Sequence, residues 1–223
     1  MKVIVVGATG MVGQGVLREA LLDARVERVL TLGRRATGQV HPKLRELIHA
    51  DLFDLSAVES QLSGFDACLY CLGVTSAGMS EADYANITYE LTLVIARTLA
   101  KVNPALTFCF VSGAGADSSE RGRVMWARVK GKTENALREL PFRAVFVFRP
   151  GLILPMDGIT SRTRSYRILY ALMTPFFPLL RRMPKRVTTT RRLGRAIVHV
   201  AAEGAPKSVL ERADLNELAG PDL

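Results

Sequence analysis

The 223-residue sequence contains only three cysteines and has no apolar run long enough to cross a membrane. Three cysteines set in apolar runs do not suit a disulfide framework, which favours a reducing compartment, and we therefore expect a cytoplasmic protein. No stretch approaches the roughly 18 uninterrupted apolar residues that a spanning helix needs, and the first residues lack the long apolar core of a signal peptide. The sequence therefore favours a globular protein that is not exported.

The sequence also lacks the usual motifs of metal and hydrolase sites. Without H-x-x-x-H or H-E-x-x-H pairs, we expect no metal site. The serine of "VSGAG" (111–115) is not set in G-x-S-x-G, and the three histidines lie far from it in sequence, so a catalytic triad is disfavoured. Cys68 and Cys71 have C-x-x-C spacing, but residues three apart on a strand point to opposite faces. We therefore expect these cysteines to be structural.

Acidic residues are missing from Gly158 to Ala202, although ten basic residues lie there and the whole chain carries a net charge of +9. The positive electrostatic potential of such a basic segment attracts phosphorylated cofactors, anionic lipid or nucleic acid. The favoured interpretation is a solvated surface or a cap over an anionic substrate. The alternative is a module that contacts a membrane or nucleic acid through residues 162–195.

Short apolar runs alternate along the chain with segments of helical spacing. Strands are expected at 2–7, 28–33, 44–51, 66–73, 106–113 and 143–151, and helices at 11–22, 56–62, 81–101 and 123–140. Nearly continuous apolar strands indicate a parallel sheet covered on both faces. We predict an α/β protein with a doubly wound parallel sheet (Rossmann fold), built as a single domain over residues 1–223.

Residues 152–223 are expected to contribute a small C-terminal cap on the substrate side. Two helices are predicted there, at 165–173 and 191–202. The prolines of "TPFFP" (174–178) force an irregular connection between them, because proline has no amide donor.

The stretch "VVGATGMVGQGV" (5–16) places Gly7, Gly10 and Gly13 between the first strand and the first helix. Glycines here permit a tight turn, a close approach of a pyrophosphate, and close packing of helix on strand. The helix N-terminus then offers free amides and partial positive charge to a diphosphate. The segment predicts a dinucleotide-binding turn made of Gly7, Ala8, Thr9, Gly10, Met11, Val12 and Gly13.

The second predicted strand ends in Gly33-Arg34-Arg35, where NAD-selective sites commonly carry a carboxylate. A guanidinium can hold a 2′-phosphate through paired, charge-assisted hydrogen bonds. We therefore favour NADP over NAD as the cofactor. The alternative is that both arginines only face solvent.

The glycine motif is followed in order by "HADLFD" (49–54), "CLG" (71–73), "VSGAG" and "FRPG" (148–151). This series resembles the atypical short-chain dehydrogenase superfamily, nearest to the Tat-interacting-protein type of oxidoreductase. The resemblance implies an oxidoreductase acting on a small carbonyl or hydroxyl substrate, and a homodimer. By position it also implies that Asp51 and Leu52 contact the adenine and that Cys71, Leu72 and Gly73 line the ribose and diphosphate. Pro150 and Gly151 would border the nicotinamide. Ser112 would be the active-site serine, and Lys130 the lysine that binds the nicotinamide ribose.

One position departs from the family signature Tyr-x-x-x-Lys, because this chain has Trp126 four residues before Lys130. The two share a helix face, but an indole offers only an N–H donor and cannot act as the acid or base. Three interpretations stay open. Another donor replaces the tyrosine, namely Ser112, Tyr84, Tyr89 or a water; the protein binds NADP without turnover as a sensor or regulator; or Trp126 is only an interface or core aromatic.

Overall fold

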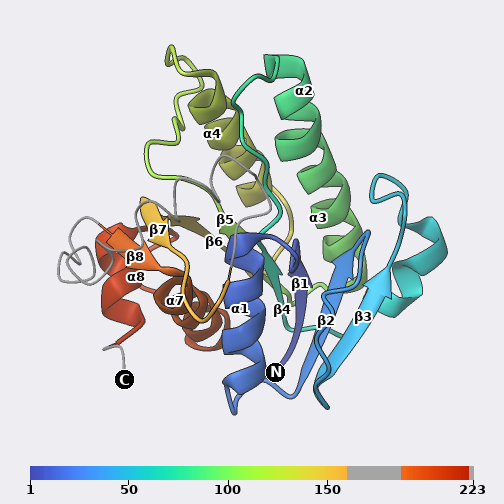
Figure 1. Ribbon diagram of the computed structural model, residues 1–223. Coiled ribbons are helices and arrows are strands. Elements are labelled where there is room, and N and C mark those ends of the chain that lie inside the picture. Colours follow the sequence, from blue (N-terminus) through green and yellow to red (C-terminus); the bar gives the residue numbers. More distant parts are fainter. Residues whose placement is uncertain (160–186, 221–223) are drawn as a thin grey trace.

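The computed structural model describes residues 1–159 and 187–220. Its centre is a seven-stranded sheet in the order β3-β2-β1-β4-β5-β6-β9, in which all neighbouring strands are parallel (Figure 1). The strands are β1 (Lys2–Val6), β2 (Arg28–Gly33), β3 (Leu44–Ile48), β4 (Ala67–Tyr70), β5 (Thr107–Val111), β6 (Ala144–Arg149) and β9 (Val209–Glu211). The predicted doubly wound α/β fold is confirmed.

Helices cover both faces of this sheet (Figure 1). One face carries α1 (Met11–Leu22), α7 (Thr190–Glu203) and α8 (Arg212–Leu218). The other carries η1 (Ser56–Leu62), α3 (Leu91–Val102) and α4 (Met125–Arg138). Because every parallel connection must cross over the sheet, this layering follows directly from the alternation of strands and helices in the sequence.

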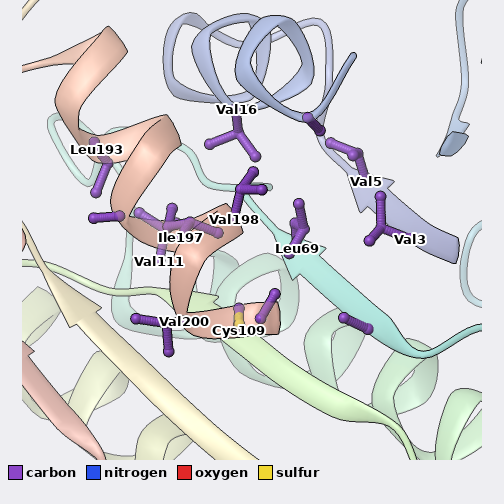
Figure 2. Packing of buried hydrophobic residues seen from close by; sticks show 14 of the residues in the cluster. Val3, Val5, Val16, Leu69, Cys109, Val111, Leu193, Ile197, Val198 and Val200 are labelled. Carbon is purple, nitrogen blue, oxygen red and sulfur yellow. The ribbon is translucent and has the colours of Figure 1, made fainter. Parts of the chain in front are cut away.

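Alternate residues of each central strand feed two separate cores. Val3 and Val5 of β1 pack with α1 and α7, whereas Ile4 and Val6 pack with α3 on the opposite face. Figure 2 shows the first core, where side chains of α1 and α7 meet side chains of β1, β4 and β5. Burial of each such side chain contributes roughly 1.5–3 kcal/mol, which explains why the strands are apolar on both faces.

The cysteines follow the same alternation. Cys68 belongs to the core under α3, whereas Cys71 packs against the core under α1 and α7. Cys109 also belongs to the latter core, and all three thiols are free. Burial raises the pKa of Cys68, Cys71 and Cys109 above the ordinary thiol value. The prediction that the C-x-x-C pair points to opposite faces is confirmed.

The helix expected over residues 81–101 is not a uniform α-helix. It consists of α2 (Glu81–Ala85), a π-helical turn η2 (Asn86–Glu90) and then α3. The carbonyl of Thr88 accepts hydrogen bonds from the hydroxyls of Thr92 at 2.7 Å and Thr133 at 3.3 Å. These hydroxyls compete with backbone amides for the carbonyl, which is a recognised way for threonine to disturb a helix.

Part of the C-terminal region belongs to the main layers of the fold. Strand β9 extends the main sheet beside β6, and α7 packs on α1. An ideal Cβ on Gly194 would lie 2.8 Å from the Gly15 carbonyl oxygen, so glycine permits this close helix contact. A separate parallel pair joins β7 (Leu152–Leu154) to β8 (Val187–Thr189).

The helix expected at 191–202 is found as α7, whereas the one expected at 165–173 lies outside the described residues. The substrate-side cap over 152–223 therefore stays a prediction. Within residues 1–159 and 187–220, no helix combines the length and apolarity that crossing a membrane requires.

Candidate functional site

A cavity of about 850 Å³ lies along the carboxyl ends of the parallel strands, where the loops after β1 and β4 diverge. This is the topological switch point at which open α/β sheets bind ligands. Most residues expected to contact the cofactor line it: Gly7, Thr9, Gly10, Met11, Val12, Arg34, Arg35, Asp51, Leu52, Cys71, Leu72, Gly73, Lys130, Pro150 and Gly151. Ser112 also lines it, but Ala8, Gly13 and Trp126 do not.

The first and third glycines of the turn are there for close backbone packing. Gly7 has a φ of +81°, and an ideal Cβ on it would lie 2.5 Å from the Leu72 amide nitrogen. A Cβ on Gly13 would lie 2.1 Å from the Gly7 carbonyl oxygen. Ala8 is buried behind the turn. Gly7 and Gly13 therefore let β1, β4 and α1 approach closely at the edge of the cavity.

The N-terminus of α1 faces this cavity through Met11 and Val12. Its N-cap is Gly10, which supplies no side-chain cap, and the first turn contains no acidic residue. The amides of a first helical turn have no partners within the helix and carry partial positive charge. With Gly10 keeping the approach clear, this is a cradle that fits a diphosphate.

One end of the cavity is polar and basic. Arg34 and Arg35 are exposed on its wall directly after β2. Asp51 after β3 accepts a hydrogen bond from the Phe53 amide at 2.8 Å, which fixes the loop that carries the buried Leu52. Phe53 is 43% exposed and also lines the cavity, a contact that the sequence analysis did not identify.

The opposite end contains a buried polar network that the sequence analysis missed. Ser112 donates its hydroxyl hydrogen to Oε1 of Glu134 at 2.5 Å. Glu134 is fully buried on α4, and its carboxylate accepts hydrogen bonds from Nε and Nη2 of Arg149 at 3.1 and 2.5 Å. The two-point contact fixes the orientation of the carboxylate. The serine at the end of β5 is therefore tied to α4 and β6.

Lys130 lies one helical turn before Glu134 and lines the cavity. Its Nζ is 3.4 Å from the Val111 carbonyl oxygen and 5.4 Å from the centre of the Phe110 ring. Burial lowers the pKa of Lys130 from 10.5 to about 8, although the nearby Glu134 carboxylate acts in the opposite direction. Burial therefore makes Lys130 a weaker base than an ordinary lysine.

Trp126 lies one turn earlier on α4 and covers the loop after β5. Ideal Cβ positions on Gly113 and Gly115 would lie 3.5 and 3.7 Å from atoms of its ring. The indole is half-buried against these glycines and does not border the cavity formed by the described residues. Tyr84 and Tyr89 are likewise absent from that lining, and burial raises the pKa of Tyr84.

A model of the "NAD dependent epimerase/dehydratase family" matches residues 3–121, more than half of the chain. The chain belongs to this family. Among its relatives are the protein FMP52 of Chaetomium globosum, 29% identical over 68% of this chain, and HTATIP2 of Rattus norvegicus, 28% identical over 69%. The matches span 65% and 63% of the lengths of those two proteins. The predicted kinship with the Tat-interacting-protein type of short-chain dehydrogenase is confirmed.

Solved structures of epimerases and short-chain dehydrogenases share the fold. UDP-glucose 4-epimerase of Thermotoga maritima, solved with UDP-glucose, has a TM-score of 0.70 at 15% identity and covers 95% of this chain and 76% of its own. A Burkholderia cenocepacia short-chain dehydrogenase in complex with NADP has a TM-score of 0.65 at 16% identity and covers 94% and 86%. Family members of this fold bind NAD(P), and the structural neighbours include an NAD⁺ complex as well as an NADP complex.

The expected cytoplasmic location is wrong by these comparisons, because six fungal relatives are named as mitochondrial proteins. The physical reason is that free cysteines indicate a reducing compartment rather than an oxidising one, but they do not show which reducing compartment the protein occupies.

Proposed function

We propose that this protein is an NADP-dependent oxidoreductase of the atypical short-chain dehydrogenase type that acts on a small carbonyl or hydroxyl substrate. The observation that carries the proposal is one continuous cavity. It runs from the two arginines after β2, past the uncapped α1 N-terminus, to Ser112 and Lys130 after β5 and on α4. When bound, the dinucleotide would supply or accept the hydride.

The preference for NADP rests on charge at the end of β2. Arg34 and Arg35 border the cavity there, and Gly33-Arg34-Arg35 at the end of β2 contains no carboxylate that would select NAD. In this proposal the arginines bind the 2′-phosphate, the amides of Met11 and Val12 bind the diphosphate, and Pro150 and Gly151 border the nicotinamide.

Calorimetry with NADP and NAD tests this assignment. We expect the wild type to bind NADP at least about 10-fold more tightly than NAD, and each of Arg34→Ala and Arg35→Ala to weaken NADP binding while leaving NAD binding unchanged. Arg45→Ala, on the exposed surface of β3 and away from the cavity lining, is the control. Equal affinities for both dinucleotides in all four proteins would refute the preference.

A second candidate function is an NADP sensor without turnover. Trp126 favours it, because the family tyrosine is replaced by a side chain that cannot donate the proton and that packs on Gly113 and Gly115 instead. The two functions are separated by following NADPH oxidation with a panel of small carbonyl compounds in the wild type and in Trp126→Tyr. If the wild type does not oxidise NADPH whereas Trp126→Tyr does, the sensor function is supported. Turnover by the wild type would refute it.

Contact with a membrane or nucleic acid through residues 162–195 stays an alternative proposal. Most basic residues of this segment lie outside the described residues. Two on α7 make intramolecular ion pairs, Arg191 with Asp157 at 2.5 Å and Arg195 with Glu19 at 3.2 Å. Binding to anionic liposomes or an oligonucleotide that persists at physiological salt would support this alternative. A homodimer is also proposed, and light scattering of the purified protein tests it.

A further inference from the structure

The proposed reduction needs a proton for the substrate oxygen, and the side chain at the family tyrosine position cannot deliver it. The Trp126 indole is an N–H donor without acid strength, and its ring packs on Gly113 and Gly115 rather than bordering the cavity. Tyr84 and Tyr89 do not line the cavity among the described residues, and the Tyr89 ring instead holds Nζ of Lys132 at 4.3 Å. The two nearby tyrosines are therefore poorly placed to replace the missing hydroxyl.

Ser112 reaches the cavity, but its single hydroxyl hydrogen is already engaged. It donates to Glu134, and that carboxylate is fully buried and held by Arg149. A hydroxyl carries one hydrogen and two lone pairs. Ser112 therefore presents lone pairs to the cavity and can accept a hydrogen bond there, but it cannot donate one without leaving a buried carboxylate short of a partner, which is costly.

Lys130 offers protons on a cationic amine at this end of the cavity as the described residues define it, whereas burial raises the pKa of the Cys71 thiol in the same lining and makes it a poorer acid. It is one helical turn from Glu134, and its Nζ has three hydrogens, of which one is directed at the Val111 carbonyl at 3.4 Å. Its neighbours are the Glu134 carboxylate on α4, with Arg149 of β6 behind it, and the Phe110 ring and Val111 carbonyl of β5; Ser112 and Cys71 line the same cavity. The amine is thus partly desolvated, with one nearby carboxylate to favour its charged form.

We propose that Lys130 is the catalytic acid and base of this site and that Glu134 is its positioning residue, an inference that rests on the proposed oxidoreductase function. In the reduction, the carbonyl carbon accepts a hydride from the reduced dinucleotide, and the π electron pair moves to the oxygen. That oxygen takes a proton from the Lys130 ammonium, which becomes a neutral amine and regains a proton from water. In the oxidation, the neutral amine removes the hydroxyl proton. Glu134 holds Ser112 as an acceptor and keeps a negative charge one turn from the amine.

The protonation of Lys130 is measurable without any substrate. We expect an NMR pH titration of ¹³Cε-lysine protein, with the Lys130 signal assigned by its loss in Lys130→Met, to show a midpoint near 8. Glu134→Gln should move the midpoint to a lower pH, because it removes the negative charge that favours the ammonium. A midpoint at the ordinary lysine value of about 10.4 in the wild type would overturn the proposal.

Turnover separates the failure of this inference from the failure of the proposed function. Lys130→Arg keeps the positive charge but cannot give up a proton, so we expect NADPH binding within about 3-fold of wild type and kcat reduced at least about 100-fold. Lys132→Arg, at an exposed position two residues away, is the matched control and should keep wild-type kcat. An active wild type with an equally active Lys130→Arg overturns the role of Lys130 alone. A wild type that binds no dinucleotide, or that oxidises no NADPH with any carbonyl compound of the panel, overturns the proposed function, and this inference with it.

Discussion

Gly13→Ala is expected to destabilise the protein by forcing α1 away from β1. The new Cβ would lie 2.1 Å from the Gly7 carbonyl oxygen, 2.7 Å from the Gly7 carbonyl carbon and 2.8 Å from Cα of Ala8. All three are backbone atoms, so no side chain can rotate away, and the helix must move by about 1 Å to reach ordinary contact. Overpacking of this kind costs about 1–3 kcal/mol, against a gain of about 1 kcal/mol from the better helix propensity of alanine. Because all three contacts are with backbone atoms, we expect the upper end of that cost, about 3 kcal/mol, and so a net loss of about 2 kcal/mol.

Gly10→Ala is the matched control, because a Cβ there would meet only the Gly7 carbonyl oxygen at 3.4 Å. For a domain of this size, 1 kcal/mol corresponds to about 2–4 °C in Tm. Thermal unfolding followed by circular dichroism should therefore show Gly13→Ala lower by about 4–8 °C and Gly10→Ala within about 2 °C of wild type. Gly10 lines the cavity whereas Gly13 does not, so Gly10→Ala should instead lower NADP affinity at least about 10-fold.

A Gly13→Ala variant that melts with the wild type would show that α1 and β1 are not in the close contact that the structure shows. A Gly10→Ala variant that keeps full NADP affinity would show that a side chain at the N-cap does not meet the diphosphate.

Three further predictions concern stability. Asn103→Ala should cost about 2–4 kcal/mol in urea unfolding, because this buried amide donates to the Leu62 carbonyl at 2.8 Å and accepts from the Phe65 amide at 2.9 Å; an unchanged midpoint would contradict that role. The free energy of unfolding should fall as pH rises above about 8.5, because burial raises the pKa of Cys68 and Cys109 in the folded protein and the unfolded chain therefore loses these protons first. A variant with both Cys68→Ala and Cys109→Ala should show a weaker dependence of this free energy on pH between about pH 8 and 10. An identical dependence would refute the assignment. Gly194→Ala should lower Tm by a few degrees, because its Cβ would meet the Gly15 carbonyl oxygen at 2.8 Å; a Tm equal to wild type would rule out the close contact between α7 and α1.

The main sheet could be predicted because six of its strands carry their own signal. In β1, β2, β4, β5 and β6 this signal is a run of apolar residues, and burial on both faces removes the need for polar alternation. The edge strand β3 is mostly exposed, and its signal is limited to Leu44, Leu47 and Ile48. Strand β9 carries no such signal, because it has three residues and ends in Glu211, and only its pairing with β6 makes it a strand. The π-helical turn at Asn86–Glu90 was also missed, and its Thr88 carbonyl has one hydrogen-bond partner, Thr133 on α4, that lies far away in sequence.

The nucleotide half of the site could be predicted for a similar reason. The glycine turn, the arginines after β2 and the loops after β3 and β4 are local sequence features at strand ends, and the fold brings all strand ends to one edge. The network of Ser112, Glu134 and Arg149 could not be, because a buried ion pair depends on how α4 lies against β6. The one available signal was the spacing of Trp126, Lys130 and Glu134, four residues apart on one helix face.

Because of this spacing, Glu134 affects both the stability of the fold and the chemistry of Lys130. The Glu134 carboxylate is the shared partner of a β5 hydroxyl and a β6 guanidinium, and it lies one turn from the Lys130 amine. Removing one partner of a buried ion pair typically costs about 3–5 kcal/mol, so Glu134→Leu would unfold part of the population and reduce activity without informing on proton transfer. Glu134→Gln keeps the shape and one acceptor oxygen while removing the charge. A shift in the Lys130 titration in Glu134→Gln, measured where the variant is still folded, therefore reports the electrostatic effect of the carboxylate on the amine separately from its role in holding α4 to the sheet.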